Sequence, residues 1–335
     1  MSDAYAKAGV DQGAADSAVA GLVRALGAIQ LGRPSAQVPL PGHYASVIRI
    51  DERTGIALST DGVGTKLVVA EELGRFDTVG IDCVAMNVND VICVGAEPLA
   101  MLDYIAIERA DPAVCEEIGV GLARGAELAG IEIPGGELAQ LGDLVRGVDV
   151  SGACFGTVAL DAIVDGAAVQ PGDVVIGLPS SGLHSNGYTL ARSALAGIGL
   201  GEDPEDRLRR PLGEALLEPT EIYVKPVVEL LRSAIDVRGL AHVTSGGTGN
   251  LLRLAAAVGY EIDSPLPVPP IFELIAERGE VSDEEMHEVF NMGCGFCVVV
   301  PESDESGALE LLRAHYPGAA RIGRAVAGPP RIERR

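Results

Sequence analysis

Apolar residues recur at two different spacings along the chain, and the spacing predicts which segments are helices and which are strands. Apolar positions three and four residues apart predict helices over 16–29, 78–94, 112–129, from about 188 onward, around Tyr223 and over 303–315. Short apolar runs bounded by turn-forming residues predict strands over 45–50, 56–60, 99–107, 152–160, 174–178 and 320–326. This mixture predicts an α+β fold.

The ends of several helices are predicted from capping residues. The predicted caps are Asp16 or Ser17 for the first helix, Asp111-Pro112 for the third and Glu218-Pro219-Thr220 for the helix around Tyr223. Gly119, Gly121 and Gly125 in the third helix miss the dinucleotide-binding spacing, so we expect them to serve close helix packing. Residues 328–335 are expected to form a frayed tail.

A stretch rich in turn-forming residues divides the chain. It covers 162–173 and includes Asp165-Gly166 and Pro171-Gly172-Asp173. The predicted division is an N-terminal domain over 1–161, a connector over 162–169 and a C-terminal α/β domain over 170–335. A second such stretch, 32–44, precedes the first predicted hairpin and is either a flap over a ligand or a plain connector, because composition fits both.

The 335 residues are 47% hydrophobic with a mean hydropathy of +0.27, which is enough to build real cores. The longest apolar runs, such as 174–178 and 296–300, are much shorter than the roughly 20 residues that a membrane span needs. The first residues lack a basic region followed by an apolar core, the pattern of a secretory signal. We therefore expect a cytoplasmic protein that does not use a membrane as a partner.

The chain is strongly acidic, with 48 acidic and 25 basic residues and a net charge of −23. Such a surface repels nucleic-acid backbones and anionic membranes, which argues against binding of either. Only Lys7, Lys66 and Lys225 are lysines. Two explanations fit this composition: adaptation to high salt, where screening relieves self-repulsion, or a GC-rich genome that favours arginine codons.

Six cysteines are spread through apolar segments without the regular spacing of a disulfide framework. Cys294 and Cys297 have the spacing of a redox or zinc motif, but no second pair accompanies them. The motif leads directly into a valine-rich run, so we interpret both as structural core residues.

Carboxylates, glycines and a lysine are concentrated where a predicted strand ends. Asp61 can hold a divalent metal, Gly62 and Gly64 let backbone amides approach phosphate oxygens, and Thr65-Lys66 adds a hydroxyl and a positive charge. The lysine does not close a Gly-x-x-x-x-Gly-Lys run, so this is not a Walker A loop. The segment alone fits a phosphate site and a tight turn equally well.

The helix predicted over 78–94 is apolar on most sides, yet it carries Asp82, Asn89 and Asp90. Ionised carboxylates in a buried helix are costly unless they meet a cation or are well hydrogen-bonded. We therefore expect a ligand site here, with a structural cap or a hydrogen bond between subunits as the alternative. Gly135-Gly136-Glu137 is predicted as another glycine turn that bears a carboxylate.

Two further segments combine a histidine with a glycine turn before a predicted helix. They are His184-Ser185-Asn186-Gly187 and His242 to Gly247, which includes Gly246. Backbone amides at such turns bind anions, and a histidine there can move protons. Each histidine alone is more often a structural residue, but the recurrence favours a ligand role.

These segments together resemble the phosphoribosylformylglycinamidine cyclo-ligase family, in its archaeal form. The matching segments, in order, are 5–11, 60–66, 76–82, 85–90, 95–98, 134–137, 184–187, 219–225 and 242–247. The resemblance extends from about residue 5 to residue 325. It implies an ATP-dependent enzyme of purine biosynthesis that closes an imidazole ring and forms a C–N bond.

In the chemistry that the resemblance implies, ATP phosphorylates the formamide oxygen of formylglycinamidine ribonucleotide, and an internal nitrogen then attacks the activated carbon and releases phosphate. Mg²⁺ accompanies ATP, with K⁺ as a possible second ion. The family also implies a homodimer in which N-terminal strands of two subunits complete a barrel, with ATP near that interface.

The resemblance assigns roles to residues already singled out. Implied metal ligands are Asp61, Asp82, Asp90 and Glu137; implied contacts to ATP are Asp61, Gly62, Gly64, Thr65, Lys66, Asp82, Asn89, Gly135, Gly136 and Glu137. Implied substrate contacts are Ser185, Asn186, Gly187, Gly246 and Gly247, and implied catalytic residues are His184, His242 and Lys66.

The chain departs from the family pattern in three places. The flap at 40–45 is shorter than the usual glycine run, the segment 138–143 lacks the usual Thr-Ala pattern, and Ser245 replaces a glycine. These changes put the substrate contacts near 138–143 in doubt. A small-molecule kinase or a paralogue with another substrate in the same superfamily, and a nucleotide-binding regulator without catalysis, remain as alternatives.

Overall fold

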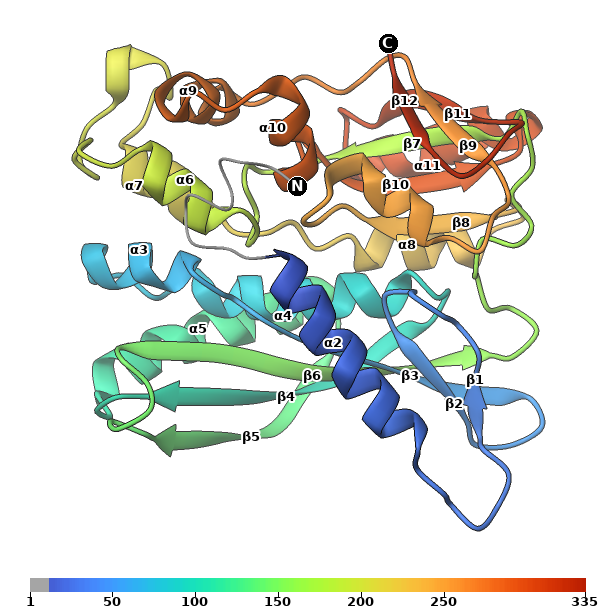
Figure 1. Cartoon of the computed structure of the whole chain (residues 1–335), viewed down its shortest axis with the longest axis horizontal. Helices are drawn as coiled ribbons and strands as arrows, with labels where there is room; N and C mark the ends of the chain where they lie inside the picture. Colours follow the sequence, from blue (N-terminus) through green and yellow to red (C-terminus); the bar gives the residue numbers. More distant parts are fainter. Residues whose placement is uncertain (1–11) are drawn as a thin grey trace.

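The computed structural model describes residues 12–335 and contains two six-stranded sheets with helices packed between and around them (Figure 1). The first sheet has the order β1-β2-β3-β6-β4-β5, and the second has the order β12-β9-β11-β7-β10-β8. The fold is therefore mixed α and β, as the sequence predicted. The barrel between subunits stays a prediction.

The first sheet comes from the N-terminal half of the chain. Its strands are β1 (Gln37–Val38), β2 (Ser46–Arg49), β3 (Thr54–Gly62), β4 (Glu97–Ile107), β5 (Glu132–Gln140) and β6 (Val148–Ala159). The accompanying helices are α2 (Gln12–Gly27), α3 (Lys66–Leu73), α4 (Val79–Ile92) and α5 (Pro112–Ala129). Strands β2 and β3 form the predicted hairpin, and Asp111 caps α5 by accepting a hydrogen bond from the Ala113 N–H.

The second sheet comes from the C-terminal half. Its strands are β7 (Val174–Pro179), β8 (Gly239–His242), β9 (Gly259–Ile262), β10 (Cys294–Val300), β11 (Ala320–Val326) and β12 (Ile332–Arg334). Its α-helices are α6 (Tyr188–Ala194), α7 (Leu212–Leu217), α8 (Val224–Leu231), α9 (Pro270–Gly279), α10 (Asp283–Val289) and α11 (Glu305–His315). Three short 3₁₀ helices complete it: η1 (Pro204–Asp206), η2 (Gly247–Arg253) and η3 (Glu302–Asp304).

Helix α4 lies at the centre of the molecule, between the first sheet and the C-terminal half (Figure 1). It packs against β3, β4 and β6 on one side and against α8 and β8 on the other. Nearly all of its residues are buried, including three polar ones, Asp82, Asn87 and Asn89. The sequence correctly predicted a mostly buried helix.

Glycines let α4 and α5 approach each other closely. A Cβ atom on Gly80 would lie 2.2 Å from the backbone nitrogen of Leu122, and one on Gly121 would lie 2.7 Å from the carbonyl oxygen of Asp77. Gly125 also faces α4, whereas a Cβ atom on Gly119 would meet nothing within 4 Å. The predicted packing role is therefore confirmed for Gly121 and Gly125 and is wrong for Gly119.

Four local predictions are wrong. Gly135-Gly136-Glu137 is not a turn but the middle of β5, because this segment pairs in parallel with β4. The tail is not frayed, since Ile332–Arg334 forms β12 and pairs with β9. Helix α2 begins at Gln12, before both predicted caps, and Ser17 instead donates a hydrogen bond to Gly13 within it. Helix α8 begins after Tyr223 rather than at Glu218-Pro219-Thr220.

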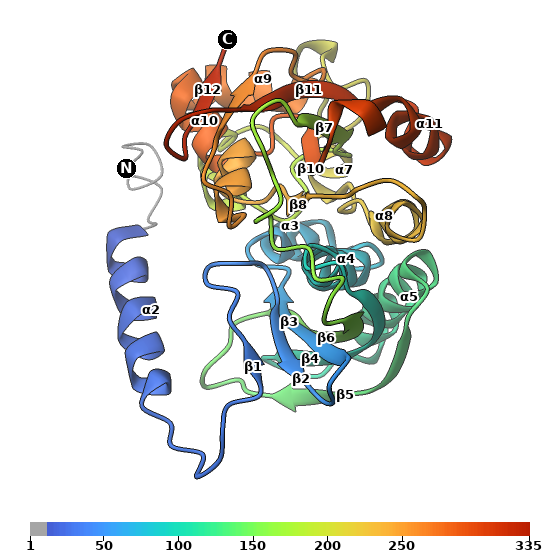
Figure 2. The ribbon, with the colours of Figure 1, turned by 90° about the vertical axis from the view of Figure 1, so that its right-hand side faces the viewer.

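Helix α2 stands apart from the rest of the described structure (Figure 2). None of its described side chains is buried, and its apolar residues Val19, Leu22, Val23 and Leu26 are all more than half exposed. Exposed apolar side chains also lie on the face of the first sheet that points away from α4, at Ile48, Leu58, Leu102 and Tyr104. Contiguous exposed apolar surface of this kind is typical of an interface.

The remaining sequence expectations concern cysteines and membranes. All six cysteines are free, and the Cys294 and Cys297 sulfur atoms lie 3.7 Å apart inside the buried strand β10. The Cys294 contact and burial raise the pKa of the Cys297 thiol, which fits the predicted structural role. Between Gln12 and Arg335, every helix is too short or too polar to cross a membrane.

Candidate active site

The buried polar side chains of α4 define the candidate site. Asp82, Asn87 and Asn89 are completely buried, and Asp90 is largely buried beside them. Buried polar groups are costly unless they find partners. The partners come from both halves of the chain, so the site spans the boundary between them.

Asp82 and Lys66 form a buried ion pair. Lys66, at the start of α3, is fully buried, and its Nζ lies 2.9 Å from each oxygen of the Asp82 carboxylate. Only Oδ1 accepts with hydrogen-bond geometry, so Oδ2 is left without a hydrogen-bond partner. Burial lowers the pKa of Lys66, and the negative charge of Asp82 opposes that shift.

The same pair joins the two halves of the chain. Lys66 also donates to the carbonyl oxygens of His184, at 3.1 Å, and Glu218, at 2.6 Å. Asp82 Oδ1 accepts from the backbone N–H and hydroxyl of Thr220 and from the hydroxyl of Ser185. The three donors of Lys66 are therefore all used within the protein. Lys66 therefore has no N–H left to donate to a phosphate, because its ammonium group is buried among these protein partners.

Asn89 and Asn87 also have specific structural partners. Asn89 donates to the Glu221 carbonyl and accepts from the Tyr223 N–H, which fixes the segment before α8. Asn87 accepts from the Asp61 N–H at 3.0 Å and donates to the Asp61 carbonyl at 3.1 Å. Asn89 was predicted as an ATP contact, and its amide is occupied here by protein groups. Asn87, which positions Asp61, was missed although it lies in the same helix pattern.

Asp90 orients one of the two predicted histidines. Its Oδ1 lies 2.9 Å from His242 Nδ1, and its Oδ2 accepts from the Ser59 hydroxyl at 3.4 Å. A carboxylate on Nδ1 holds the proton there and leaves Nε2 as an acceptor. His242 is completely buried at the end of β8, and its Nε2 has no partner.

His184 has the opposite arrangement. Its Nε2 accepts from the Ser181 N–H at 3.2 Å, so a neutral ring carries its proton on Nδ1, and this atom is buried without a partner. Burial, with the nearby His242 and Lys66, lowers the pKa of His184 well below its usual value. The two histidines thus hold one unused donor and one unused acceptor.

The carboxylates divide between the two faces of the first sheet. Asp61, Gly152, Asp103 and Gly136 are register partners across β3, β6, β4 and β5, and the Asp103 carboxylate occupies the space that a side chain on Gly136 would fill. Asp61 and Asp103 face α4. Glu137 pairs with Tyr104 and points with it to the opposite, exposed face. Within one chain, the structure therefore separates Glu137 from Asp61.

The donor set fits a magnesium ion that also binds nucleotide phosphates. Burial raises the pKa of Asp61, and the negative charge of Asp90 adds to this effect. A cation would relieve both. Residues 12–335 contain no group of three side chains that could hold a metal ion alone. Mg²⁺ commonly uses one or two carboxylates and completes its shell with phosphates and water.

The two histidine-glycine turns contact each other. Ser245 donates to Asn186 at 3.2 Å, and a Cβ atom on Gly247 or on Gly187 would clash with the loop around Phe290. Gly187 and Gly246 both have positive φ, which glycine adopts without strain. The helices that follow are short: α6 has seven residues, and η2 is a 3₁₀ helix rather than the predicted α-helix.

The glycine motif before α3 remains accessible. Gly64 has positive φ, a side chain on it would meet nothing within 4 Å, and Thr65 contacts Thr189 through their hydroxyl groups. Gly62 ends β3. These residues keep the open backbone that a phosphate contact needs, whereas Gly135 and Gly136 lie within a strand.

The flap predicted over 40–45 lies against the C-terminal half. The Tyr44 hydroxyl donates to the Asn250 carbonyl at 3.1 Å, and the Arg253 guanidinium lies 4.8 Å from the centre of the Tyr44 ring. Both ring nitrogens of His43 are buried without a partner, and burial lowers the pKa of His43 to about 4. Sequence reasoning missed His43 and Arg253; the histidine within the turn-rich segment was the available signal.

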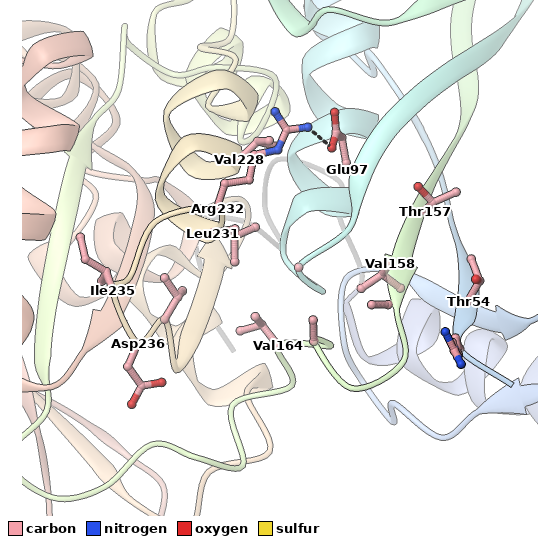
Figure 3. Close-up of a pocket in the computed structure, with 15 residues that line it drawn as sticks. Thr54, Glu97, Thr157, Val158, Val164, Val228, Leu231, Arg232, Ile235 and Asp236 are labelled. Carbon is pink, nitrogen blue, oxygen red and sulfur yellow. Dashed lines mark hydrogen bonds and ion pairs between the residues drawn. The ribbon is translucent and has the colours of Figure 1, made fainter.

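A separate cavity of about 520 Å³ lies between the two halves beside the connector (Figure 3). Its walls include Val158 of β6, Val164 of the connector and Leu231 of α8, and the Arg232–Glu97 ion pair crosses it at 2.5 Å. None of the predicted site residues lines it. The candidate site is therefore the polar cluster around α4 and not this cavity.

Family models match both halves of the chain. The AIR synthase related protein N-terminal domain matches residues 42–158, and the corresponding C-terminal domain matches residues 170–333. Solved structures with the same fold include a HypE–HypF complex (TM-score 0.64, 20% identity, covering 87% of this chain and 90% of that one) and thiamine monophosphate kinase from Aquifex aeolicus (TM-score 0.63, 16% identity, 94% and 96%).

Curated relatives are much more similar in sequence. The phosphoribosylformylglycinamidine cyclo-ligase of Methanothermobacter thermautotrophicus is 52% identical over 283 residues, which are 83% of this chain and 82% of the relative. The protein of the same name from Pyrococcus furiosus is 48% identical over 319 residues, 93% of this chain and 92% of the relative. The chain therefore belongs to the phosphoribosylformylglycinamidine cyclo-ligase family.

Proposed function

We propose that the chain closes the imidazole ring of formylglycinamidine ribonucleotide with ATP and yields aminoimidazole ribonucleotide, ADP and phosphate. The observation that carries this proposal is the pair of buried, unpartnered ring nitrogens on His184 and His242, beside carboxylates suited to Mg²⁺. Unpartnered buried polar atoms need a ligand that completes them. The relatives of the same name support the choice of reaction.

In the proposed reaction the formamide oxygen attacks the γ-phosphorus of ATP, and ADP leaves. An internal nitrogen then attacks the activated carbon, the C–O bond to phosphate breaks, and the nitrogen loses its proton. Positioning and neutralisation of charge supply most of the acceleration in such reactions. His184 Nδ1–H is suited to donate to the substrate oxygen, and His242 Nε2 is suited to accept a proton.

Asp61 and Asp90 are the proposed ligands of Mg²⁺, which would neutralise charge on the phosphates when bound. The open backbone at Gly62, Gly64 and Thr65 is proposed to contact the same phosphates. Lys66 and Asp82 are proposed to hold the two halves at the correct distance rather than to bind ATP. Glu137 is proposed to reach a nucleotide only where a second subunit covers its face of the sheet.

We further propose a homodimer formed through that exposed face. Ile48, Leu58, Leu102 and Tyr104 lie on it, and the apolar side of α2 is also uncovered. An isolated helix of 16 residues is marginally stable in water, so α2 needs a partner surface. The proposed units of each subunit are residues 1–161 and 170–335, joined by 162–169, and K⁺ is the proposed activating ion.

The test is an assay with formylglycinamidine ribonucleotide, ATP, Mg²⁺ and K⁺ that follows the aminoimidazole product together with ADP. Product and ADP should form in equal amounts. Asp61→Asn should raise the KM for Mg·ATP at least about tenfold, since a charged ligand is lost, without a change in melting temperature. ADP with a phosphorylated substrate but no ring product would instead identify a kinase. Well-folded protein without turnover would refute the proposal.

A further inference from the structure

The flap and the 3₁₀ helix η2 form a contact between the two halves of the chain. Tyr44 is 8% exposed, its hydroxyl donates to the Asn250 carbonyl, and its ring lies against the Arg253 guanidinium. Asn250 in turn accepts from the Thr244 N–H, in the turn that follows His242. The flap is thus anchored directly to the part of the candidate site that carries His242.

Arg253 is an exposed cation that forms no ion pair with any described residue, although the chain carries a net charge of −23. Burial raises the pKa of Asp61, and the positive charge of Arg253 opposes that rise. Burial lowers the pKa of His43, and the same charge lowers it further. A guanidinium stacked on an aromatic ring keeps its N–H edge free for a bidentate anion. Arg253 is therefore held in place with its donors unused.

His43 adds a second group that lacks a partner. Its ring packs edge-on against Tyr44, with centroids 5.6 Å apart, and both of its nitrogens are shielded from water without a hydrogen bond. Leaving such buried groups without a hydrogen-bond partner is unfavourable. A bound ligand oxygen would satisfy the N–H of a neutral ring.

We propose that Arg253 and His43, positioned by Tyr44, form a binding site for a phosphoryl group of the bound nucleotides. This inference rests on the proposed function, since it adds two phosphate contacts to the same candidate site. The phosphoryl group comes either from ATP or from the 5′-phosphate of the ribonucleotide substrate. Arg253 supplies paired N–H donors, and His43 supplies one further donor from the flap.

The first experiment measures KM for each substrate in Arg253→Gln, Arg253→Lys and Arg146→Gln. Arg146, an exposed arginine in the turn between β5 and β6, is the matched control. We expect Arg253→Gln to raise the KM for one substrate about 10- to 100-fold, as for loss of a charge-assisted hydrogen bond, with a smaller change in kcat. Arg253→Lys should recover part of the loss. Unchanged KM values for both substrates in Arg253→Gln would overturn the proposal.

The flap residues give an independent measurement. Tyr44→Phe keeps the ring under Arg253 and loses only the hydrogen bond to Asn250, so it should raise the KM less than Tyr44→Leu, which should repeat much of the Arg253→Gln defect. His43→Gln, which keeps a donor, should be closer to the unmodified chain than His43→Phe. Equal KM values for Tyr44→Leu and Tyr44→Phe would contradict positioning by the ring.

Direct binding separates the two phosphate sources and the two proposals. Calorimetry with Mg²⁺ and the non-hydrolysable analogue AMPPNP needs no turnover. Weaker AMPPNP binding by Arg253→Gln assigns the site to ATP, while unchanged AMPPNP binding with a raised KM for the ribonucleotide assigns it to the 5′-phosphate. Weaker AMPPNP binding in a protein without cyclo-ligase turnover supports the site and refutes only the proposed function. Turnover with unaltered Arg253→Gln kinetics and binding refutes only the site.

Discussion

Lys66 has a different role in the structure from the one that its sequence context predicts. The sequence presents it at the end of a glycine-rich segment, where a lysine is suited to a phosphate. The structure encloses it between the two halves, with Asp82 and two carbonyl oxygens as partners. Those carbonyls belong to residues more than 100 positions away, so no local pattern could reveal them. Asp82, by contrast, was correctly expected to need a partner.

Replacement of Lys66 by methionine should strongly destabilise the fold. The change leaves the Asp82 carboxylate buried without its counter-ion, which typically costs about 3–5 kcal/mol. Urea denaturation should show this as a lower midpoint with a similar slope. Lys225→Met is the control, because Lys225 donates an exposed hydrogen bond to the Glu127 carbonyl at 3.0 Å, and it should cost less than about 1 kcal/mol.

The pairing itself is tested by the double variant Lys66→Met/Asp82→Leu. Removing both charges removes the desolvation cost of each, so the double variant should be more stable than Lys66→Met alone. A Lys66→Met midpoint equal to that of the unmodified chain would show that the ion pair does not hold the halves together. A double variant as unstable as the sum of its single changes would show that the two residues act independently.

At the scale of elements, the sequence correctly predicted features that depend on neighbouring residues, such as the cap of one helix and a hairpin. Asp111-Pro112 predicted the start of α5, and two short apolar runs separated by turn-forming residues predicted the β2–β3 hairpin. The failures involve non-local pairing. Gly135-Gly136 has the composition of a turn but forms a strand because it pairs in parallel with β4. Ile332–Arg334 has the composition of a tail but forms a strand because it pairs with β9. Sequence spacing alone does not contain those partners.

The contact between α4 and α5 gives a prediction with an internal control. Gly80→Ala and Gly121→Ala place a methyl group within 2.2 Å and 2.7 Å of backbone atoms of the facing segment, which a rigid helix pair cannot relieve locally. Each should lower the melting temperature by about 4–8 °C or more, equivalent to about 2–4 kcal/mol. Gly119→Ala, on the open side of α5, should instead stabilise by about 0.5–1 kcal/mol.

Differential scanning calorimetry of the three variants decides the question. If Gly119→Ala and Gly121→Ala shift the melting temperature by the same amount, helix propensity rather than close packing would explain the glycines. The ordering Gly119→Ala above the unmodified chain and Gly121→Ala below it supports the packing explanation.

At the scale of the whole molecule, the sequence predicted the mixed α and β fold class, but it did not reveal which face of the sheet each residue occupies. Asp61 and Glu137 were expected to share an ion, and the register across β3, β6, β4 and β5 places them on opposite faces of the sheet. A change of one position along a strand reverses the face. The face of Glu137 is also the one that exposes Leu102 and Tyr104.

That exposed face gives the last prediction. If two subunits associate through it, sedimentation velocity at micromolar concentration should give about twice the 34.5 kDa of one chain. Leu102→Glu/Tyr104→Glu places charges in the interface and should give the monomer mass, because buried unpaired carboxylates are costly. Leu144→Glu, at a position that is 82% exposed in the turn before β6, should leave the mass unchanged. A monomeric unmodified chain would refute association through this face, whereas loss of activity in the monomeric double variant would show that the nucleotide site needs the second subunit.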